Sequence, residues 1–370
     1  MQRIIVSVTN DLVTDQRVKK VCDSLQDLDF NIILIGRKLP DSLTIKRNYK
    51  TIRMSLLFNK GFLFYAEYNI RLFFKLIFLK SDVLLANDLD TLLPNFLISK
   101  MLSKKLVYDS HELFTEVPEL ITRPKIRDFW LQIEKYIFPK LKNVYTVNKK
   151  IADFYEKKYK IPVKIIRNIP PKLSDIKIDD NLSYKIKGDK KMLIFQGSGI
   201  NIDRGAEEAV QMMQYVNNSV LYIIGSGDVI KNLKELIIDY NLENKVFIKN
   251  KMPYNDLMEY TKIADLGITL DKGTNLNYEY SLPNKVFDYV KAQIPILTSN
   301  REVVSKIVSE NNIGFVCKTH NPKKLAEIVN TILFDEELNK NWKMNLKKVA
   351  EIYTWENESE KLKEIFKNIE

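Results

Sequence analysis

Short apolar runs alternate with amphipathic stretches along the whole chain. In the first half these runs predict strands near residues 4–8, 31–35, 51–54, 83–85, 106–108 and 144–146, with helices over 15–26, 91–102 and 127–138. In the second half strands are predicted near 191–195, 221–224, 246–248, 266–269, 296–298 and 314–316. Beyond Pro322 the spacing predicts helix to the end, anchored by Trp342 and Trp355. Buried strands separated by amphipathic helices are typical of βαβ units and parallel sheets.

The two series of strands predict an α/β protein with two Rossmann-like, doubly wound parallel-sheet domains. The 370 residues are also too many for one ordinary domain. We expect an N-terminal domain at 1–168, a linker at 169–190, a C-terminal domain at 191–352 and a final helix at 353–370. The linker follows from Pro170 and Pro171 and from a polar stretch without helical periodicity.

One predicted helix, at residues 61–79, is nearly all aromatic or aliphatic. Its charges, Glu67, Arg71 and Lys75, recur every four residues and form one stripe. Three charges and an Asn exclude a transmembrane span. Two interpretations stay open: a core helix with a solvated stripe, or a helix whose aromatic face enters a membrane interface beside Lys60 and Lys80.

Composition narrows the function classes. Two Cys and two His exclude a disulfide scaffold, a Cys-rich zinc module and a poly-His metal site. The first residues lack the features of a signal peptide, so we expect a cytoplasmic protein. Residues 1–165 contain 29 Lys and Arg against 18 Asp and Glu, whereas residues 166–370 contain 29 of each. A Lys-rich genome would raise the count in both halves, so the asymmetry favours an anionic partner of the first domain, a nucleic acid or a membrane surface.

Polar residues follow the predicted strands of the first half, where open α/β sheets bind ligands. The candidates are Asp15 and Arg17 after the first strand, Asp88 and Asp90 after the fourth, and His111 and Glu112 after the fifth. No G-x-G-x-x-G occurs after the first strand, which argues against a dinucleotide oxidoreductase. Asp90 is either a helix N-cap or a site residue. For His111 we favour a sugar- or proton-handling role over packing.

In the second half a glycine-rich turn, Gly197-Ser198-Gly199, follows the first strand and precedes a helix near Arg204. Glycines let backbone N–H groups approach a phosphate, and a helix N-terminus and a guanidinium add positive potential. The same arrangement recurs one unit later at Gly225. These features predict a phosphate site.

A segment from Tyr278 to Tyr289 is the most specific of the sequence. Lys285 and Asp288 are three residues apart, so they share one face of a helix. That geometry can place an ammonium on a diphosphate and a carboxylate on ribose hydroxyls. A simple surface ion pair is the alternative.

These motifs together resemble the GT-B glycosyltransferases. The S-x-P-x-K-x-x-[DE]-Y…P-[IV] segment starting at Ser281, the D-x-H-E ending at Glu112 and the glycine turn are most similar to the retaining family 4, which builds bacterial envelope polysaccharides. The resemblance implies the GT-B fold, with two domains facing across a cleft and a C-terminal helix that returns to the first domain.

The resemblance also implies roles for single residues. Arg204 and Lys285 would hold the donor diphosphate beside Gly197, Ser198, Gly199 and Gly225, with Asp288 on the ribose and His111 over the donor sugar. Glu279, Tyr280 and Ser281 would also contact the sugar, although the first Glu of the family's E-x7-E pair falls here on Tyr280. We therefore expect His111, Arg204 and Lys285 to be catalytic, and Asp15, Arg17, Asp88, Asp90 and Glu112 to face the acceptor.

The function expected from this resemblance is transfer of a sugar from a UDP-sugar, or less favourably a GDP-sugar, with retention of configuration. The acceptor would be a saccharide or lipid-linked molecule of capsule, O-antigen or lipopolysaccharide synthesis. We expect no metal, no other cofactor and no nucleic acid, and a peripheral position on the anionic inner face of the cell membrane. The alternatives are a GT-B-like UDP-sugar epimerase and a non-catalytic basic module that binds lipid or RNA.

Overall fold

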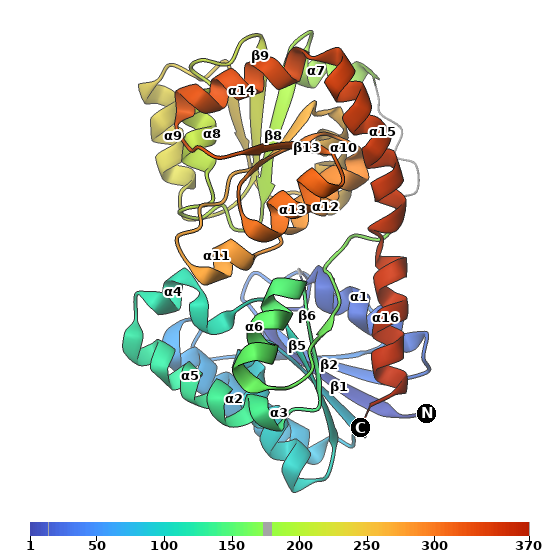
Figure 1. Cartoon of the computed structure of the whole chain (residues 1–370). Helices are drawn as coiled ribbons and strands as arrows, with labels where there is room; N and C mark the ends of the chain where they lie inside the picture. Colours follow the sequence, from blue (N-terminus) through green and yellow to red (C-terminus); the bar gives the residue numbers. More distant parts are fainter. Residues whose placement is uncertain (14, 173–179, 370) are drawn as a thin grey trace. The chain divides into compact units, whose positions relative to one another are not determined.

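The computed structural model describes residues 1–13, 15–172 and 180–369 (Figure 1). The chain divides into two compact units, one made of Met1–Asn168 and Trp355–Glu370 and the other of Ile169–Thr354. Each unit contains one parallel sheet covered by helices. The prediction of two doubly wound α/β sheets is confirmed.

The first unit has a seven-stranded sheet in the order β3-β2-β1-β4-β5-β6-β7. Its strands are β1 (Arg3–Asp11), β2 (Asn31–Lys38), β3 (Lys50–Ser55), β4 (Val83–Asn87), β5 (Lys105–Ser110), β6 (Asn143–Thr146) and β7 (Lys164–Ile165). The helices are α1 (Gln16–Gln26), α2 (Gly61–Phe78), α3 (Leu89–Met101), α4 (Pro118–Ile121), α5 (Pro124–Ile137), α6 (Lys149–Tyr159) and α16 (Trp355–Lys367), with 3-10 turns at Phe114–Glu116 and Phe138–Lys140. Six strands lie where the apolar runs predicted them, whereas β7 is too short to give a pattern.

Both faces of this sheet are buried, which is why its strands read as continuous apolar runs. Ile4, Val6 and Val8 of β1 pack on one face with residues of α1 and α16. Ile5 points to the other face, where it joins Tyr68 and other side chains of α2. Successive side chains of a strand point to opposite faces, so β1 connects two separate cores.

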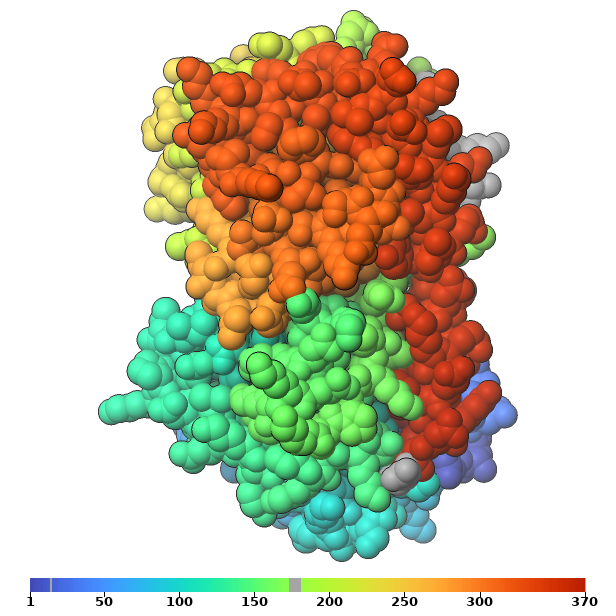
Figure 2. Space-filling view, viewed as in Figure 1, coloured from blue at the N-terminus to red at the C-terminus, as the bar shows by residue number. Residues whose placement is uncertain are grey.

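The last helix, α16, belongs to the first unit although it is last in the sequence. It packs against α1, and the Trp355 indole donates a hydrogen bond to Ser24 Oγ at 3.0 Å. The Phe366 ring meets the Phe30 ring edge to face, with centroids 6.0 Å apart. In the space-filling view α16 lies in red on the surface of this unit (Figure 2). Trp355 and Trp342 are both buried, as predicted.

The second unit has a six-stranded sheet in the order β10-β9-β8-β11-β12-β13. Its strands are β8 (Lys191–Gly197), β9 (Ser219–Gly225), β10 (Val246–Lys249), β11 (Leu266–Thr269), β12 (Ile296–Ser299) and β13 (Gly314–Cys317). Its helices are α7 (Asp180–Lys187), α8 (Ala206–Met212), α9 (Ile230–Asp239), α10 (Tyr254–Ile263), α11 (Leu276–Tyr280), α12 (Asn284–Ala292), α13 (Glu302–Glu310), α14 (Pro322–Phe334) and α15 (Glu336–Ile352). All six strands match the predicted runs.

The segment predicted as a linker without helical structure needs a correction. Residues 180–187 form α7, because Leu182 and Ile186 are four apart and both pack against the core of the second unit. Residues 173–179 of that segment lie outside the described part of the chain.

Candidate functional site

Each sheet has one point at which the strand order reverses, and such points are where open α/β sheets bind ligands. In the second unit this point lies between β8 and β11, and in the first between β1 and β4. Polar side chains gather beyond the carboxyl ends of both pairs of strands.

Arg204 is held in place at the β8–β11 switch point. Its Nη1 donates to Asp271 Oδ2 at 2.9 Å, and its guanidinium lies 3.9 Å from the centre of the Tyr278 ring. Asp271 follows β11 and is almost wholly buried. An ion pair on one side and an aromatic face on the other fix the guanidinium plane, which favours bidentate binding of a phosphate.

Lys285 lies in the first turn of α12 and points back to the same switch point. Its Nζ is 3.9 Å from the centre of the Phe195 ring on β8. Burial lowers the pKa of Lys285 to about 8; the charge of Asp271 opposes this and the charge of Arg204 adds to it. The charges of Asp271 and Arg204 both act on Lys285, so the two cations lie in the same part of the switch point. Lys285 forms no ion pair with any described residue, so an anion there would gain a desolvated cation.

Two glycine turns meet beside this cluster. Gly197 ends β8 and is paired in register with Gly225, which ends β9. Gly225 has φ +146, and a Cβ there would lie 1.8 Å from the Gly197 carbonyl oxygen, so no other residue fits. Ser198 and Gly199 are exposed in the turn that follows. The predicted phosphate turn therefore exists as a backbone structure, and its role in binding stays a prediction.

The N-terminus of α8 is less positive than the sequence suggested. The helix begins after Gly205, but its first turn contains Glu207 and Glu208. Glu208 pairs with Lys272 at 2.6 Å. These two carboxylates offset the positive potential at the helix N-terminus. Attraction for an anion at this site therefore depends on Arg204 and Lys285.

Asp288 points away from solvent on the buried side of α12. Its Oδ2 accepts a hydrogen bond from Gln196 Nε2 at 2.9 Å, and its Oδ1 accepts one from the Tyr254 hydroxyl at 2.8 Å. The alternative of a surface Lys285–Asp288 ion pair is wrong, because Asp288 is 8% exposed and Lys285 turns to Phe195. The ribose role of Asp288 stays a prediction, with Gln196 and Tyr254 orienting the carboxylate.

The predicted sugar-contacting residues lie on and after α11. Glu279 is paired with Arg301, which follows β12, and it also accepts a hydrogen bond from the Glu302 N–H at 3.3 Å. Ser281 bonds back to the Tyr278 carbonyl at 3.0 Å, and Tyr280 is partly exposed. The sequence interpretation missed Asp271 and Arg301. Both follow predicted strands, so the rule that selected the other candidates was sufficient to find them.

At the switch point of the first unit, Asp88 has a strained backbone. Its φ of 58° and ψ of 167° belong to a region that only glycine adopts freely. Asp88 is the N-cap residue of α3 but makes no capping bond with its side chain. Its carboxylate binds His111 instead, accepting from the backbone N–H at 2.8 Å and lying 3.0 Å from Nδ1. Strain of this kind is typical of functional sites.

Asp90 is not the N-cap of α3, so that interpretation is corrected. It lies in the first turn of the helix and is buried, and its Oδ2 accepts a hydrogen bond from Thr9 at 2.6 Å. Burial, together with the charge of Asp88, raises the pKa of Asp90 to about 7. This carboxyl group can therefore exchange a proton near neutral pH.

His111 is held between two carboxylates. Nε2 lies 3.1 Å from Asp109 Oδ2, opposite the contact of Nδ1 with Asp88. Burial opposes the charged form, but Asp88 and Asp109 raise the pKa of His111 well above its usual value. An imidazolium is therefore present at neutral pH. To contact a sugar, one ring nitrogen must release its carboxylate, and the catalytic role of His111 stays a prediction.

Arg17 also belongs to this network and contacts Asp109. Its guanidinium binds both oxygens of Asp109, at 2.9 and 2.6 Å, and donates to the Ile166 carbonyl at 3.1 Å. Although burial disfavours the Asp109 carboxylate, Arg17 and His111 lower its pKa to about 2. Arg17 is 4% exposed, so it positions Asp109, and through it His111.

The other predicted acceptor residues lie nearer the surface. Asp15 caps α1 by accepting from the Val18 N–H at 3.0 Å and also accepts from Asn10. Glu112 is partly exposed, and its carbonyl accepts from Ser110 at 2.9 Å. Their roles toward an acceptor stay predictions.

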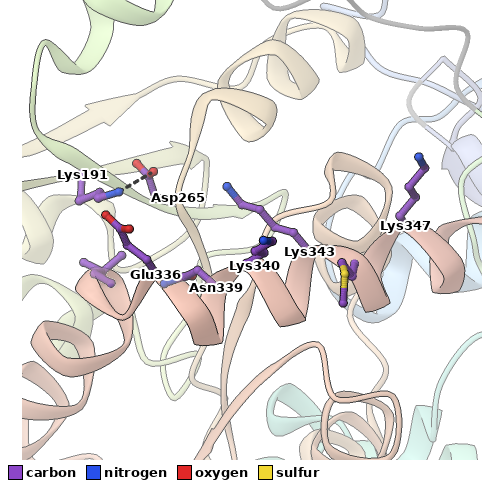
Figure 3. Close-up of a pocket in the computed structure, with 9 residues that line it drawn as sticks. Lys191, Asp265, Glu336, Asn339, Lys340, Lys343 and Lys347 are labelled. Carbon is purple, nitrogen blue, oxygen red and sulfur yellow. Dashed lines mark ion pairs between the residues drawn. The ribbon is translucent and has the colours of Figure 1, made fainter.

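A pocket of about 480 Å³ lies elsewhere in the second unit (Figure 3). Lys340, Lys343 and Lys347 of α15 line it together with the Lys191–Asp265 ion pair. Lys191 is the first residue of β8, whereas the site described above follows its last residue, Gly197. The pocket is therefore at the amino ends of the strands, the wrong edge for a donor site.

No group of three or more His, Cys, Asp or Glu side chains in the described part could hold a metal ion. None of the helices formed by those residues combines the length and the apolar character needed to cross a bilayer.

Comparison with known proteins adds independent information. The family model of glycosyl transferases group 1 matches residues 178–349. No curated protein matches the chain. Sucrose-phosphate synthase from Thermosynechococcus elongatus has a similar structure, with TM-score 0.79 and 14% identity over 99% of this chain and 98% of that one.

Two further solved structures are similar over almost the whole chain. Anabaena HepE, solved in complex with UDP and glucose, gives TM-score 0.76 and 13% identity over 100% of both chains. WaaG, a glycosyltransferase involved in lipopolysaccharide biosynthesis, gives TM-score 0.70 and 14% identity over 97% of this chain and 98% of that one. The predicted GT-B fold is confirmed. The match of residues 178–349 to the glycosyl transferases group 1 model and the GT-B fold both support a glycosyltransferase.

Proposed function

We propose that the protein transfers a sugar from a nucleoside diphosphate sugar, with the diphosphate held by Arg204 and Lys285. The observation that carries the proposal is the placement of both cations at the β8–β11 switch point, where Arg204 pairs with Asp271 and the Lys285 ammonium lies over Phe195 of β8. Both side chains are fixed by aromatic rings, Tyr278 and Phe195, and so need little reorganisation to bind an anion.

The proposed chemistry follows from where charge develops. Cleavage of the bond between the sugar and the diphosphate puts negative charge on the leaving phosphate. Arg204 and Lys285 would stabilise that charge, and loss of one such group commonly costs about 3 kcal/mol of transition-state stabilisation. Because two protein cations supply the charge, we propose that no metal is needed. We also propose that the sugar keeps its anomeric configuration, as the resemblance to family 4 implies.

For the donor base we propose uridine before guanosine. HepE was solved with UDP and with UDP-glucose, which supports this choice. For the acceptor we propose a saccharide or lipid-linked molecule of the cell envelope, such as a lipopolysaccharide, O-antigen or capsule precursor. The likeness to WaaG and the basic first half of the chain support this acceptor class. The protein would then act at the inner face of the cell membrane.

The test is a thermal-shift panel of nucleotides and nucleotide sugars, followed by product analysis. We expect UDP and one UDP-sugar to raise the unfolding temperature, and that sugar to be transferred only when an acceptor is present. Conversion of a UDP-sugar such as UDP-GlcNAc to its epimer without acceptor would identify an epimerase instead. Absence of any shift across the panel would favour a non-catalytic binding module.

A further inference from the structure

Helix α2 has two apolar sides, and only one of them is covered. Phe64, Tyr68, Leu72 and Leu76 are buried against the sheet of the first unit. The opposite side carries the α2 patch, which we define as Phe62 (56% exposed), Leu63 (54%), Ile70 (59%), Phe74 (54%) and Phe78 (80%). Spacings of seven and four residues place Leu63, Ile70 and Phe74 on one line along the helix. Soluble monomers rarely expose so many large apolar side chains together.

The charged stripe of α2 does not shield this patch. The Glu67 carboxylate accepts hydrogen bonds from the Leu57 and Phe58 N–H groups at 2.9 Å and pairs with Arg71 at 2.6 Å. Glu67 therefore holds the loop before α2 against the helix, with its charge compensated. The side chains of Leu57 and Phe58 in that loop are 80% and 44% exposed, and they extend the apolar surface.

Lysines lie at or just after the C-terminal ends of α2, α3 and α5. Helix α3 packs against α2, and the two helices lie next to α5 (Figure 1). Lys100 and Lys140 lie 5.6 and 5.9 Å from the centre of the same Phe96 ring. With Lys80, which follows the exposed Phe78 by two residues, they form what we call the basic rim. Exposed Met101 and Tyr136 lie among these lysines.

We propose that the α2 patch and the basic rim dock the protein on an anionic lipid bilayer. A helix with aromatic side chains on one face and lysines at its edge is suited to lie in the plane of the headgroups, with its apolar face below them. A second copy of the chain is a poorer occupant. A two-fold contact would bring together two first halves that each contain 29 Lys and Arg against 18 Asp and Glu, and like charges repel. The proposal concerns the first unit alone and does not depend on the donor site.

The test measures binding of the full chain to vesicles in low salt. The vesicles are either pure phosphatidylcholine or an equal mixture with phosphatidylglycerol. The variants are I70S/F74S for the patch and K100Q/K140Q for the rim. I238S/F334S is the matched control, because Ile238 and Phe334 are similarly exposed in the second unit, on α9 and α14. UDP affinity and the unfolding temperature of each variant check the donor site and the fold.

We expect the wild type and I238S/F334S to bind the anionic vesicles equally and to release them in 1 M NaCl. I70S/F74S should bind at least tenfold more weakly, and K100Q/K140Q should lose most of its preference for anionic over neutral lipid. UDP binding should not change in any variant. Unaltered vesicle binding by I70S/F74S would overturn the proposal. The proposal would also be overturned if the wild type formed a dimer that does not bind vesicles, and if I70S/F74S were a monomer.

Discussion

Arg204 donates to Asp271 across 2.9 Å, and the same Asp271 raises the pKa of Lys285 against the effect of its burial. One buried carboxylate thus pairs with Arg204 and acts through its charge on Lys285, 81 positions later in the sequence. The charge of Arg204 still lowers the pKa of Lys285, so Asp271 offsets only part of the repulsion between the two cations. With a diphosphate present, it orients Arg204 and helps Lys285 to stay protonated.

The first prediction concerns the pH dependence of UDP binding. Lys285, with a pKa of about 8, is charged below that pH and neutral above it. UDP affinity should therefore be constant near pH 7 and fall as the pH rises through 8. In K285R the guanidinium stays charged, so this fall should disappear, whatever the absolute affinity. Titrations between pH 7 and 9.5 measure both; an identical fall in K285R would assign the effect to another group.

The second prediction concerns the network that holds His111. Asp109→Asn leaves Arg17 and His111 buried without their shared carboxylate, which should lower the free energy of unfolding by about 3–5 kcal/mol. The pKa of Asp109 is about 2 in the folded chain, below the usual value of 3.8. Its contribution is therefore complete above pH 3.8 and is lost as the pH falls toward 2. Urea unfolding should show a wild-type advantage at pH 7 that narrows toward pH 3. An unchanged midpoint in D109N at pH 7 would contradict the network.

The third prediction concerns Asp90, whose ionisation lowers the stability of the folded chain instead of raising it. The pKa of Asp90 is raised to about 7 from the usual value of 3.8, so the folded chain loses stability as the pH rises between these values. Asp90→Asn removes the charge and keeps the shape. The variant should be more stable than the wild type at pH 8, by up to about 4 kcal/mol, and no more stable near pH 4. If Asp90 serves the acceptor, the same variant should be less active. Unfolding temperatures at both pH values test this, and a destabilised D90N at pH 8 would refute it.

The fourth prediction concerns α16. Trp355→Ala removes a buried indole and its bond to Ser24, which should cost the first unit about 3–5 kcal/mol. Calorimetry of the full chain should show an earlier transition. Y184A, at the exposed Tyr184 of α7, is the control and should leave the transitions in place.

Much of the fold was predictable because most of its strands and helices have a recognisable local pattern of apolar residues. The buried strands of both sheets are apolar runs with many β-branched residues, and the helices between them have a 3.6-residue period. The elements that the sequence did not predict are very short or depend on contacts between residues distant in the sequence. Two residues of β7 give no pattern, and α7 is stabilised by the core it packs on.

The sequence predicted where most site residues lie, but it predicted fewer of the residues that they contact. Placement after strands selected Arg204 and His111, and the motif that begins at Ser281 selected Lys285; all three lie at the two switch points. The sequence could not tell that Asp88, rather than Asp90, is the N-cap residue, or that its carboxylate turns to His111. It also could not tell that Asp288 binds Gln196, because those residues lie on different elements 92 positions apart.

The central claim, that Arg204 and Lys285 hold a nucleoside diphosphate, is tested most directly by calorimetric titration of UDP. R204A and K285A are compared with the wild type and with K306A, which removes an exposed lysine of α13 in the same unit. We predict that R204A and K285A each bind UDP at least tenfold more weakly, whereas K306A binds as the wild type does. Equal affinity of all four proteins for UDP would contradict the account.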